Sequence, residues 1–435
     1  MRLEVSPATA PLKGELRPPG DKSISHRALI FGGLAAGDSP LEGLLEAGDT
    51  MATQHAMSQL GARFSRTDSG LLVQGVGARG LSEPAGVLDM GNSGTAMRLL
   101  AGVLAGQPFN SVLSGDQSLN SRPMKRIMEP LGLMGARIHS EPDGRAPLRI
   151  EGNPALRGIR YQSPVASAQI KSCLLLAGLF AQGETVISEP RLSRDHSERM
   201  LPAFGIEMGP GISLQGGQRL QACPVQVPAD PSSAAFLVAA ALLVPGSDLL
   251  LTHVGLNPTR TAFFRAVLAM GGELTVQNER EAAGERVGDL RVRYSPRLQA
   301  IDLPADWIPA MIDEVPILLA LAACAEGTTR VRDAAELRVK ESDRLAVMAR
   351  GLEAMGCPVQ EYPDGIDVTG ADCHFAEVDS AHDHRCAMSL AVLGLRAEGG
   401  VSIRDAQYID TSYPSFRAHL EGLGVTLRLL QESPA

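Results

Sequence analysis

Six stretches of the chain are rich in Ala and Leu and would place apolar residues on nearly every side of a helix. A helix that is apolar all round is buried, so we predict six inner helices. A glycine and a short β-branched stretch follow these helices, as at 183–187 and 327–331. The inner helices are predicted near 28–36, 97–105, 174–180, 234–244, 317–325 and 387–395.

A second helix-like segment in each part of the chain ends in a large apolar residue followed by Gly. Glycine adopts the left-handed conformation that ends a helix at little cost. The six glycines are between 66 and 85 residues apart, which predicts six repeats of about 70 residues, each with strands and two helices. The pairs are Leu60-Gly61, Met134-Gly135, Phe204-Gly205, Met270-Gly271, Met355-Gly356 and Leu423-Gly424.

The repeats predict an α/β protein of two domains with three repeats each. The Pro/Ala stretch at 227–230 separates the third repeat from the fourth, and Pro18-Pro19-Gly20 is a second break. We therefore expect an N-terminal domain over 21–228 and a C-terminal domain that includes 229–435. The first strand, near 3–16, could belong to either domain.

Composition excludes several classes of protein. With 44% hydrophobic and 20% charged residues the 435-residue chain is globular, and its net charge of -9 argues against nucleic-acid or anionic-membrane partners. The six cysteines form no C-x-x-C pair, so we expect reduced thiols without disulfides or zinc. No apolar run reaches membrane-spanning length and no signal peptide is visible, so we expect a cytoplasmic protein.

Polar residues precede each predicted inner helix. Ser, Asn and Asp cap helices, and for Asp230-Pro-Ser-Ser capping alone is an equally good explanation. Capping does not account for Lys, Arg and Gln on the same turns, because a cation opposes the helix dipole. A bound anion would remove this conflict. The segments are 22–27 (Lys-Ser-Ile-Ser-His-Arg), 91–95 (Gly-Asn-Ser-Gly-Thr), Ser163 with 167–169 (Ser-Ala-Gln), 230–233, 313–314 (Asp-Glu) and 383–385 (Asp-His-Arg).

Two further segments carry charge. Arg122 precedes Pro123 in 116–125, which favours an extended loop that leads into a helix. Along 338–344 the charges alternate, and on one helix Lys340 and Arg344 would repel each other at i,i+4. We interpret that repulsion as a sign of a shared anionic ligand.

Taken in order, these segments resemble the 5-enolpyruvylshikimate-3-phosphate (EPSP) synthase family over essentially the full chain. Any one segment is weak evidence, but all of them in order, one set per repeat, form a specific signal. The matching segments are 19–27, 91–98, 116–124, 167–171, 257–260 (Asn-Pro-Thr-Arg), 313–314, 338–344 and 383–385.

The resemblance implies a two-domain, inverse α/β, barrel-like fold with three βαβαββ repeats and buried parallel helices in each domain. It also implies that 1–20 joins 229–435 in the C-terminal domain and that the active site lies in the interdomain cleft. The implied reaction transfers the enolpyruvyl group of phosphoenolpyruvate to the 5-hydroxyl of shikimate 3-phosphate and releases phosphate, a step toward chorismate and the aromatic amino acids. The resemblance implies no cofactor or metal and a monomeric enzyme.

The resemblance also implies the roles of individual residues. Asp313 would be the base and Glu341 the acid, with Lys22 assisting, and which carboxylate acts in each half-step stays open. Phosphoenolpyruvate would be bound by Lys22, Gly94, Arg122, Gln169, Arg344 and Arg385. Shikimate 3-phosphate would be bound by Lys22, Ser23, Arg27, Ser167, the backbone of Ala168, Gln169, Asp313 and Lys340.

Two positions depart from the pattern of many or some relatives, and a third matches the glyphosate-sensitive members. Thr411 stands near the Tyr-Pro pair where many relatives have Lys, which removes one expected contact to the phosphoenolpyruvate phosphate. Arg191 stands where some relatives have Tyr. Gly94 is the small residue of glyphosate-sensitive members, so we expect sensitivity here.

Other functions are compatible with parts of the pattern. The sister transferase that acts on UDP-N-acetylglucosamine has Lys-Asn in the first motif and a Cys in its mobile loop, whereas this chain has Lys22-Ser23 and no Cys before Cys173. An RNA 3′-phosphate cyclase has related repeats but requires a nucleotide-accepting His. A non-catalytic anion-binding repeat protein is the remaining alternative.

Overall fold

The computed structural model describes residues 1–77 and 79–431. The chain forms two compact units. The N-terminal unit consists of Gly20–Pro228 and Glu281–Glu285, and the C-terminal unit consists of Met1–Pro19, Ala229–Arg280 and Arg286–Ala435. Each unit has a hydrophobic core of its own.

The second repeat of the N-terminal unit shows the basic pattern most simply. Its main elements run β, α, β, α, β, β along the chain, and its sheet has the order β6-β7-β9-β8. The first two strands are parallel and the remaining pairs are antiparallel. The elements are β6 (Leu88–Asp89), α3 (Gly94–Ala105), β7 (Ser111–Ser114), α5 (Lys125–Leu133), β8 (Arg137–Glu141) and β9 (Arg145–Glu151), with a short helix α4 (Gln117–Ser121) after β7.

The third repeat has the same topology, and the first repeat takes its first strand from the end of the unit. β14 (Val225–Gln226) pairs in parallel with β3, so the last strand of the unit closes its first sheet. The first repeat contains α1 (Lys22–Leu34), β3 (Ala36–Glu42), α2 (Gly48–Gln59), β4 (Arg63–Thr67) and β5 (Gly70–Val76). The third contains β10 (Arg160–Gln162), α6 (Ala168–Phe180), β11 (Glu184–Ser188), α7 (His196–Ala203), β12 (Met208–Gly209) and β13 (Ile212–Gln215).

The N-terminal sixteen residues supply strands to two sheets of the C-terminal unit. β2 (Lys13–Leu16) pairs in parallel with β15, and β1 (Arg2–Val5) lies between β22 and β23. The fourth repeat adds α8 (Pro231–Leu243), β15 (Asp248–Gly255), α9 (Ala262–Ala269), β16 (Glu273–Ala282) and β17 (Glu285–Arg293). The sixth adds β21 (His374–Asp379), α12 (His384–Gly394), β22 (Glu398–Arg404), α13 (Phe416–Gly422) and β23 (Leu427–Leu430).

The fifth repeat forms the middle sheet of the C-terminal unit, in the order β18-β20-β19. A parallel bridge between Asp302 and Arg330 extends this sheet where the other repeats have a first strand. The repeat contains α10 (Val315–Ala322), β18 (Thr328–Val331), α11 (Arg344–Ala354), β19 (Val359–Tyr362) and β20 (Gly365–Thr369).

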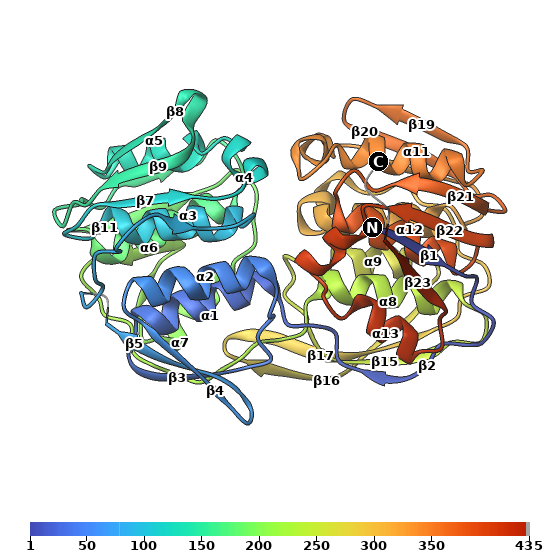
Figure 1. Ribbon diagram of the computed structural model, residues 1–435, viewed down its shortest axis with the longest axis horizontal. Helices are drawn as coiled ribbons and strands as arrows, with labels where there is room; N and C mark the ends of the chain where they lie inside the picture. The colour runs from blue at the N-terminus through green and yellow to red at the C-terminus, as the bar shows by residue number, and fades with distance from the viewer. Residues whose placement is uncertain (78, 432–435) are drawn as a thin grey trace. The chain divides into compact units, whose positions relative to one another are not determined.

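The predicted inner helices form the centre of each unit. In the N-terminal unit α3 packs against α6 and α1, and in the C-terminal unit α8, α10 and α12 pack against one another (Figure 1). All thirteen residues of α8 are buried, which agrees with its apolar sequence. Most of these helices begin several residues before the predicted ranges, because their polar first turns carry no apolar signal.

The outer helices end as the sequence predicts. Helices α2, α5, α7, α9, α11 and α13 are each followed by one large apolar residue and then a glycine in the left-handed region. The φ angles of these glycines lie between 79° and 108°. Any other residue would be strained there, so the repeated glycine is a requirement of the backbone.

Candidate active site

Side-chain caps account for many of the polar residues that begin the inner helices. Asp21, Ser93 and Ser167 accept hydrogen bonds from the backbone N–H groups at the start of α1, α3 and α6. Asp230 and Asp383 cap α8 and α12 in the same way. Capping is therefore confirmed for Asp230, whereas α10 starts after a 3₁₀ turn at Ile312–Glu314 without a side-chain cap.

The first predicted site segment forms the N-terminal part of α1. Lys22 Nζ lies 3.1 Å from Asp49 Oδ2. The buried guanidinium of Arg27 donates to Ser172 Oγ at 2.6 Å, to Ser197 Oγ at 2.8 Å and to the Ser23 carbonyl at 2.9 Å. These bonds join α1 to α6 and α7. Burial lowers the pKa of Arg27 to about 10, so the side chain remains charged at neutral pH.

The N-termini of α3 and α6 and the segment at Arg122 meet in the same unit. Arg98 Nη1 donates to Gln169 Oε1 at 2.8 Å, and Gln169 Nε2 donates to Thr95 Oγ1 at 3.1 Å. Arg122 Nη2 donates to Asn92 Oδ1 at 2.7 Å, immediately before α3. A Cβ added at Gly94 would lie 2.8 Å from Arg98 Nη1 and 3.5 Å from Arg122 Nη1. The structure therefore brings Gly94, Arg122 and Gln169 together.

In the C-terminal unit Arg344 lies among three carboxylates. Its guanidinium reaches Glu341 Oε2 at 2.5 Å, Asp383 Oδ2 at 2.8 Å and Asp313 Oδ1 at 3.1 Å. Burial alone would lower the pKa of Arg344, but these negative charges outweigh it and hold the pKa above its ordinary value. Burial alone would raise the pKa of the Asp383 carboxyl, but the positive charge of Arg344 holds this pKa below its ordinary value.

Arg385, at the start of α12, joins the same group. Its Nη1 donates to the Asp313 carbonyl at 3.2 Å and lies 3.7 Å from Glu314 Oε1. Its Nη2 lies 4.0 Å from Asp313 Oδ2. Asp313, Glu341, Arg344 and Arg385, which are distant in sequence, are therefore neighbours. This part of the predicted site contains both acidic side chains that acid–base chemistry needs.

The interpretation of Lys340 and Arg344 as repelling neighbours on one helix is wrong. A 3₁₀ helix ends at Val339, and α11 begins at Arg344 with Asp343 as its cap, so the two cations are not one helical turn apart. Lys340 Nζ pairs with Glu336 Oε1 at 2.8 Å, whereas Arg344 pairs with the three carboxylates. The charge pattern of 338–344 alone is therefore no evidence for a shared ligand, because protein carboxylates lie beside both cations.

Sequence reasoning missed two arginines. Arg98 contacts Gln169, and its pKa is lowered to about 10 by burial and then by the charges of Arg122 and Arg126. Arg194 lies close enough to Arg27 for its charge to lower the pKa of Arg27 further, whereas Arg191 is exposed. Arg98 follows the motif 91–95 by one helical turn, a spacing that could have identified it.

A buried ion-pair group fixes the segment that carries Arg194. Lys171 Nζ lies 2.7 Å from Glu198 Oε1 and 3.1 Å from Glu189 Oε1, and its side chain is 1% exposed. Glu189 also accepts hydrogen bonds from the Ser193 N–H at 2.7 Å and from its hydroxyl at 2.6 Å. The residue before Arg194 is thus tied to α6 through Glu189 and Lys171.

His26 makes the stability of the fold depend on pH. Its ring is buried between Thr53 Oγ1 at 2.7 Å and Ser93 Oγ at 3.5 Å, and burial lowers its pKa from 6.5 to about 3. Below pH 6.5 the unfolded chain binds a proton at His26 that the folded chain does not bind until about pH 3. Stability from this residue is therefore complete above pH 6.5 and is lost as the pH falls.

We predict that lowering the pH from 7 to 5 decreases the free energy of unfolding by about 2 kcal/mol through protonation of His26 in the unfolded chain. Urea unfolding at both values, compared between the wild type and His26→Asn, measures this contribution. The comparison is needed because burial also lowers the pKa of His253 and His419. Equal pH dependence in the two proteins would contradict the assignment.

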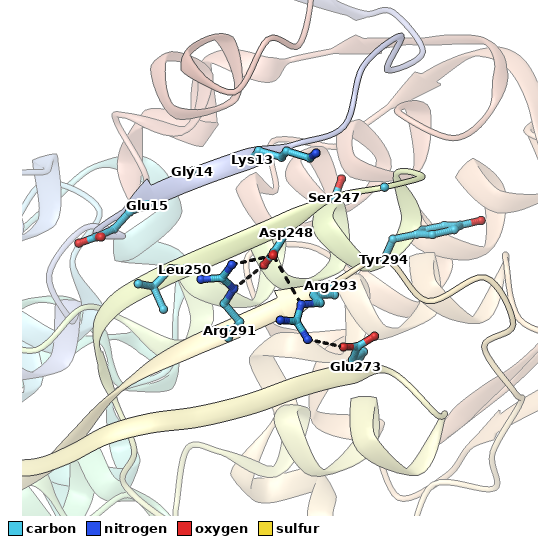
Figure 2. Close-up of a pocket in the computed structure, with 11 residues that line it drawn as sticks. Lys13, Gly14, Glu15, Ser247, Asp248, Leu250, Glu273, Arg291, Arg293 and Tyr294 are labelled. Atoms are coloured by element: carbon cyan, nitrogen blue, oxygen red, sulfur yellow. Dashed lines mark hydrogen bonds and ion pairs between the residues drawn. The ribbon is translucent and has the colours of Figure 1, made fainter.

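A hollow of about 730 Å³ on the sheet β16-β17-β15-β2 contains none of the predicted site residues. Figure 2 shows that Arg291 points to Asp248 and that Arg293 reaches both Asp248 and Glu273. Lys13 and Glu15 on β2 add one charge of each sign. The cations and anions that line this hollow balance each other, so we interpret it as a surface ladder of cross-strand charge pairs.

The described residues contain neither a metal-binding group nor a membrane-spanning helix. Within 1–77 and 79–431, no group of three or more His, Cys, Asp or Glu side chains is arranged to hold a metal ion. Across the same residues, no helix has the length and apolar character needed to cross a bilayer.

Comparison with known proteins identifies the family. A family model described as EPSP synthase (3-phosphoshikimate 1-carboxyvinyltransferase) matches residues 7–420. Two curated relatives carry the name 3-phosphoshikimate 1-carboxyvinyltransferase. The one from Xanthomonas campestris pv. campestris (strain B100) is 52% identical over 420 residues, covering 96% of each chain. The one from Magnetococcus marinus is 51% identical over 430 residues, covering 97% of this chain and 96% of the relative.

A solved structure described as EPSP synthase from Acinetobacter baumannii superimposes with a TM-score of 0.91 at 45% identity, covering 99% of this chain and 100% of that chain. This likeness confirms the predicted two-domain α/β fold. The family model, the curated relatives and the solved structure therefore agree over nearly the whole length. The chain belongs to the EPSP synthase family.

Proposed function

We propose that this chain transfers the enolpyruvyl group of phosphoenolpyruvate to the 5-hydroxyl of shikimate 3-phosphate and releases phosphate. The observation that carries the proposal is the grouping of Asp313, Glu341, Arg344 and Arg385. This group combines two candidate proton-transfer residues with two guanidinium groups. Family membership favours shikimate 3-phosphate over UDP-N-acetylglucosamine as the acceptor.

Both substrates carry a phosphate and a carboxylate, so the site must offer several cations and N–H donors. In the N-terminal unit the starts of three inner helices provide backbone N–H groups beside cationic side chains. We assign shikimate 3-phosphate to Lys22, Ser23, Arg27, Ser167, the backbone of Ala168, Gln169, Asp313 and Lys340. We propose Arg194 as an additional contact, because its charge acts on Arg27. We assign phosphoenolpyruvate to Lys22, Gly94, Arg122, Gln169, Arg344 and Arg385.

The chemistry consists of an addition followed by an elimination, and a proton moves to C3 in the first half and from C3 in the second. Asp313 takes the proton of the 5-hydroxyl as its oxygen attacks C2 of phosphoenolpyruvate, and Glu341 gives a proton to C3. The resulting tetrahedral intermediate then returns a proton from C3 to Glu341 and expels phosphate, which takes up the proton held by Asp313, so the double bond and both carboxyl groups are restored. Arg344 lies against both carboxylates and keeps them in position through the cycle. Lys22 assists by neutralising the phosphate that leaves.

Because Thr411 stands where many relatives have Lys, other cations must neutralise the phosphate of phosphoenolpyruvate. Thr411 donates its hydroxyl to the Tyr408 carbonyl at 2.7 Å and carries no charge. We therefore expect Lys22, Arg122 and Arg385 to neutralise the phosphoenolpyruvate phosphate and carboxylate. We further expect a monomeric, cytoplasmic enzyme that needs no cofactor, and sedimentation analysis of the purified chain tests the oligomeric state.

An assay of phosphate release tests the function directly. We expect release only when phosphoenolpyruvate and shikimate 3-phosphate are both present, with omission of each substrate as the control. Release with UDP-N-acetylglucosamine as the acceptor would show that the sister reaction is the correct one. Absence of release with either acceptor would support a non-catalytic anion-binding protein instead.

We predict that Gly94→Ala weakens glyphosate inhibition more than it weakens phosphoenolpyruvate binding. The added methyl would lie 2.8 Å from Arg98 Nη1 and 3.5 Å from Arg122 Nη1, so it would occupy space among the cations. Inhibition constants and KM values for both proteins measure the difference. An unchanged inhibition constant in the variant would count against a site at Gly94.

A further inference from the structure

Three cysteines that the proposed function does not use lie together in the C-terminal unit. Cys357 Sγ and Cys373 Sγ are 3.3 Å apart, and their residues are 2% and 8% exposed. Cys324 also contacts Cys373 through its thiol and is partly exposed. All three thiols are reduced in the structure. A sulfur–sulfur contact this short needs only a small movement to become a bond, which is about 2.05 Å long.

The electrostatics of the group make Cys373 its reactive member. Hydrogen bonds from the thiols of Cys324 and Cys357 lower the pKa of Cys373, with smaller contributions from His374 and Arg396. The same hydrogen bond and burial raise the pKa of Cys357. Cys373 is therefore the thiol that most readily becomes a thiolate, and Cys324 and Cys357 donate hydrogen bonds to it. A thiolate beside a thiol is the arrangement from which disulfides form.

The pair joins two elements that also meet at the proposed active site. Cys357 follows the end of α11, and Cys373 immediately precedes β21. At the opposite ends, Arg344 begins α11 and Asp383 follows β21, and these two side chains are 2.8 Å apart. Helix α11 packs against β21, as Figure 1 shows. A bond between the cysteines would therefore clamp the end of this helix–strand pair that lies away from Arg344.

We propose that Cys357 and Cys373 are an oxidation site that a peroxide converts into one intramolecular disulfide. The Cys373 thiolate attacks one oxygen of hydrogen peroxide, which yields a sulfenic acid and, after protonation, one water. The Cys357 thiol then attacks the sulfenic sulfur, which forms the S–S bond and releases a second water. The two thiols lose two electrons and two protons in total, and the peroxide is reduced to two waters.

Mass spectrometry of the full chain tests the proposal. The protein is treated with hydrogen peroxide, free thiols are alkylated under denaturing conditions, and peptides are mapped without reduction. We expect a cross-link between Cys357 and Cys373 with loss of two hydrogens, at least 10-fold faster than oxidation of Cys173. Cys173 is the internal control, because it is buried and burial raises its pKa to about 12. No cross-link, or a cross-link that joins Cys324 to Cys373, would overturn the proposal.

The thermal stability of the oxidised chain provides a second measurement. A disulfide that closes a span of 16 residues should raise the Tm of the oxidised chain by roughly 5–10 °C, and dithiothreitol should reverse the shift. Cys357→Ser should abolish the shift, whereas Cys386→Ser, which changes a buried thiol elsewhere, should retain it. A shift that persists in Cys357→Ser would assign the oxidation to other residues. Because the cross-link is mapped in the wild type, the test stands even if one variant folds poorly.

Discussion

Replacing Asp313 by Asn is expected to lower kcat by about 100- to 10,000-fold, the range for removal of a general base. The amide has the shape of the carboxylate but cannot accept the proton of the attacking hydroxyl. Arg344 keeps its contacts with Asp383 and Glu341, so the fold should persist and KM should change less than kcat. Steady-state kinetics with both substrates, together with a thermal melt, separate loss of chemistry from loss of structure.

Asp302→Asn is the matched control for this variant. Asp302 lies in the same unit, is 74% exposed at its side chain and pairs with Arg330 at 2.9 Å. An exposed ion pair contributes little to stability, and among the described residues the ion pairs of Asp302 and Arg330 include none of the proposed site residues. We expect kcat within a factor of two of the wild type in this control, on the order of other neutral surface changes. If Asp313→Asn were equally active, Asp313 could not be the base.

Replacing Lys171 by Met is expected to lower the free energy of unfolding by about 3–5 kcal/mol. Methionine has a similar length but no charge, so Glu189 and Glu198 would lose their shared cation. The side chain of Glu189 is 6% exposed and that of Glu198 is 16% exposed, so water would solvate them poorly. Urea unfolding, monitored by circular dichroism, measures the change.

Two companion variants of Lys171→Met separate the ion pairs from general effects. Lys125→Met makes the same substitution at an exposed position and should change stability by less than about 0.5 kcal/mol. Adding Glu189→Gln and Glu198→Gln to Lys171→Met should restore part of the loss, because the uncompensated charges are then removed. A Lys171→Met protein as stable as the wild type would show that the group does not hold the segment before Arg194.

The parts of the fold that the sequence predicted are those governed by local rules. A helix that is apolar all round has no polar solvent-facing side, so its sequence is a nearly continuous apolar stretch. All six predicted inner helices are present in the structure. The glycine after each outer helix is required by its left-handed φ angle, so its position in the sequence marks the helix end directly. The caps at Asp21, Ser93 and Asp383 are also local, since each side chain bonds to backbone two or three residues ahead.

The parts that sequence reasoning missed or misread depend on distant partners. Arg344 is held by Asp313 and Asp383, which are 31 and 39 residues away. Neither spacing is a helical period, so the pattern of charges in 338–344 could not reveal these contacts. The i,i+4 argument also assumed a continuous helix, and the cap at Asp343 interrupts it. Arg194 belongs to the same class, because only the folded unit places it near Arg27.

The position of the first strands has a consequence for synthesis of the chain. Nearly all of the N-terminal unit comes from 20–228, so it can acquire its core while the ribosome is still translating the rest. The other unit has the opposite problem, because Arg2 pairs with Arg404 and Leu430 at the far end of the polypeptide. Residues made first can pair only after residues made last are available, and this pairing joins strands near both ends of the described chain. We expect the edges of β22 and β23 to remain open until then, which makes this unit the one that depends most on chaperones during translation.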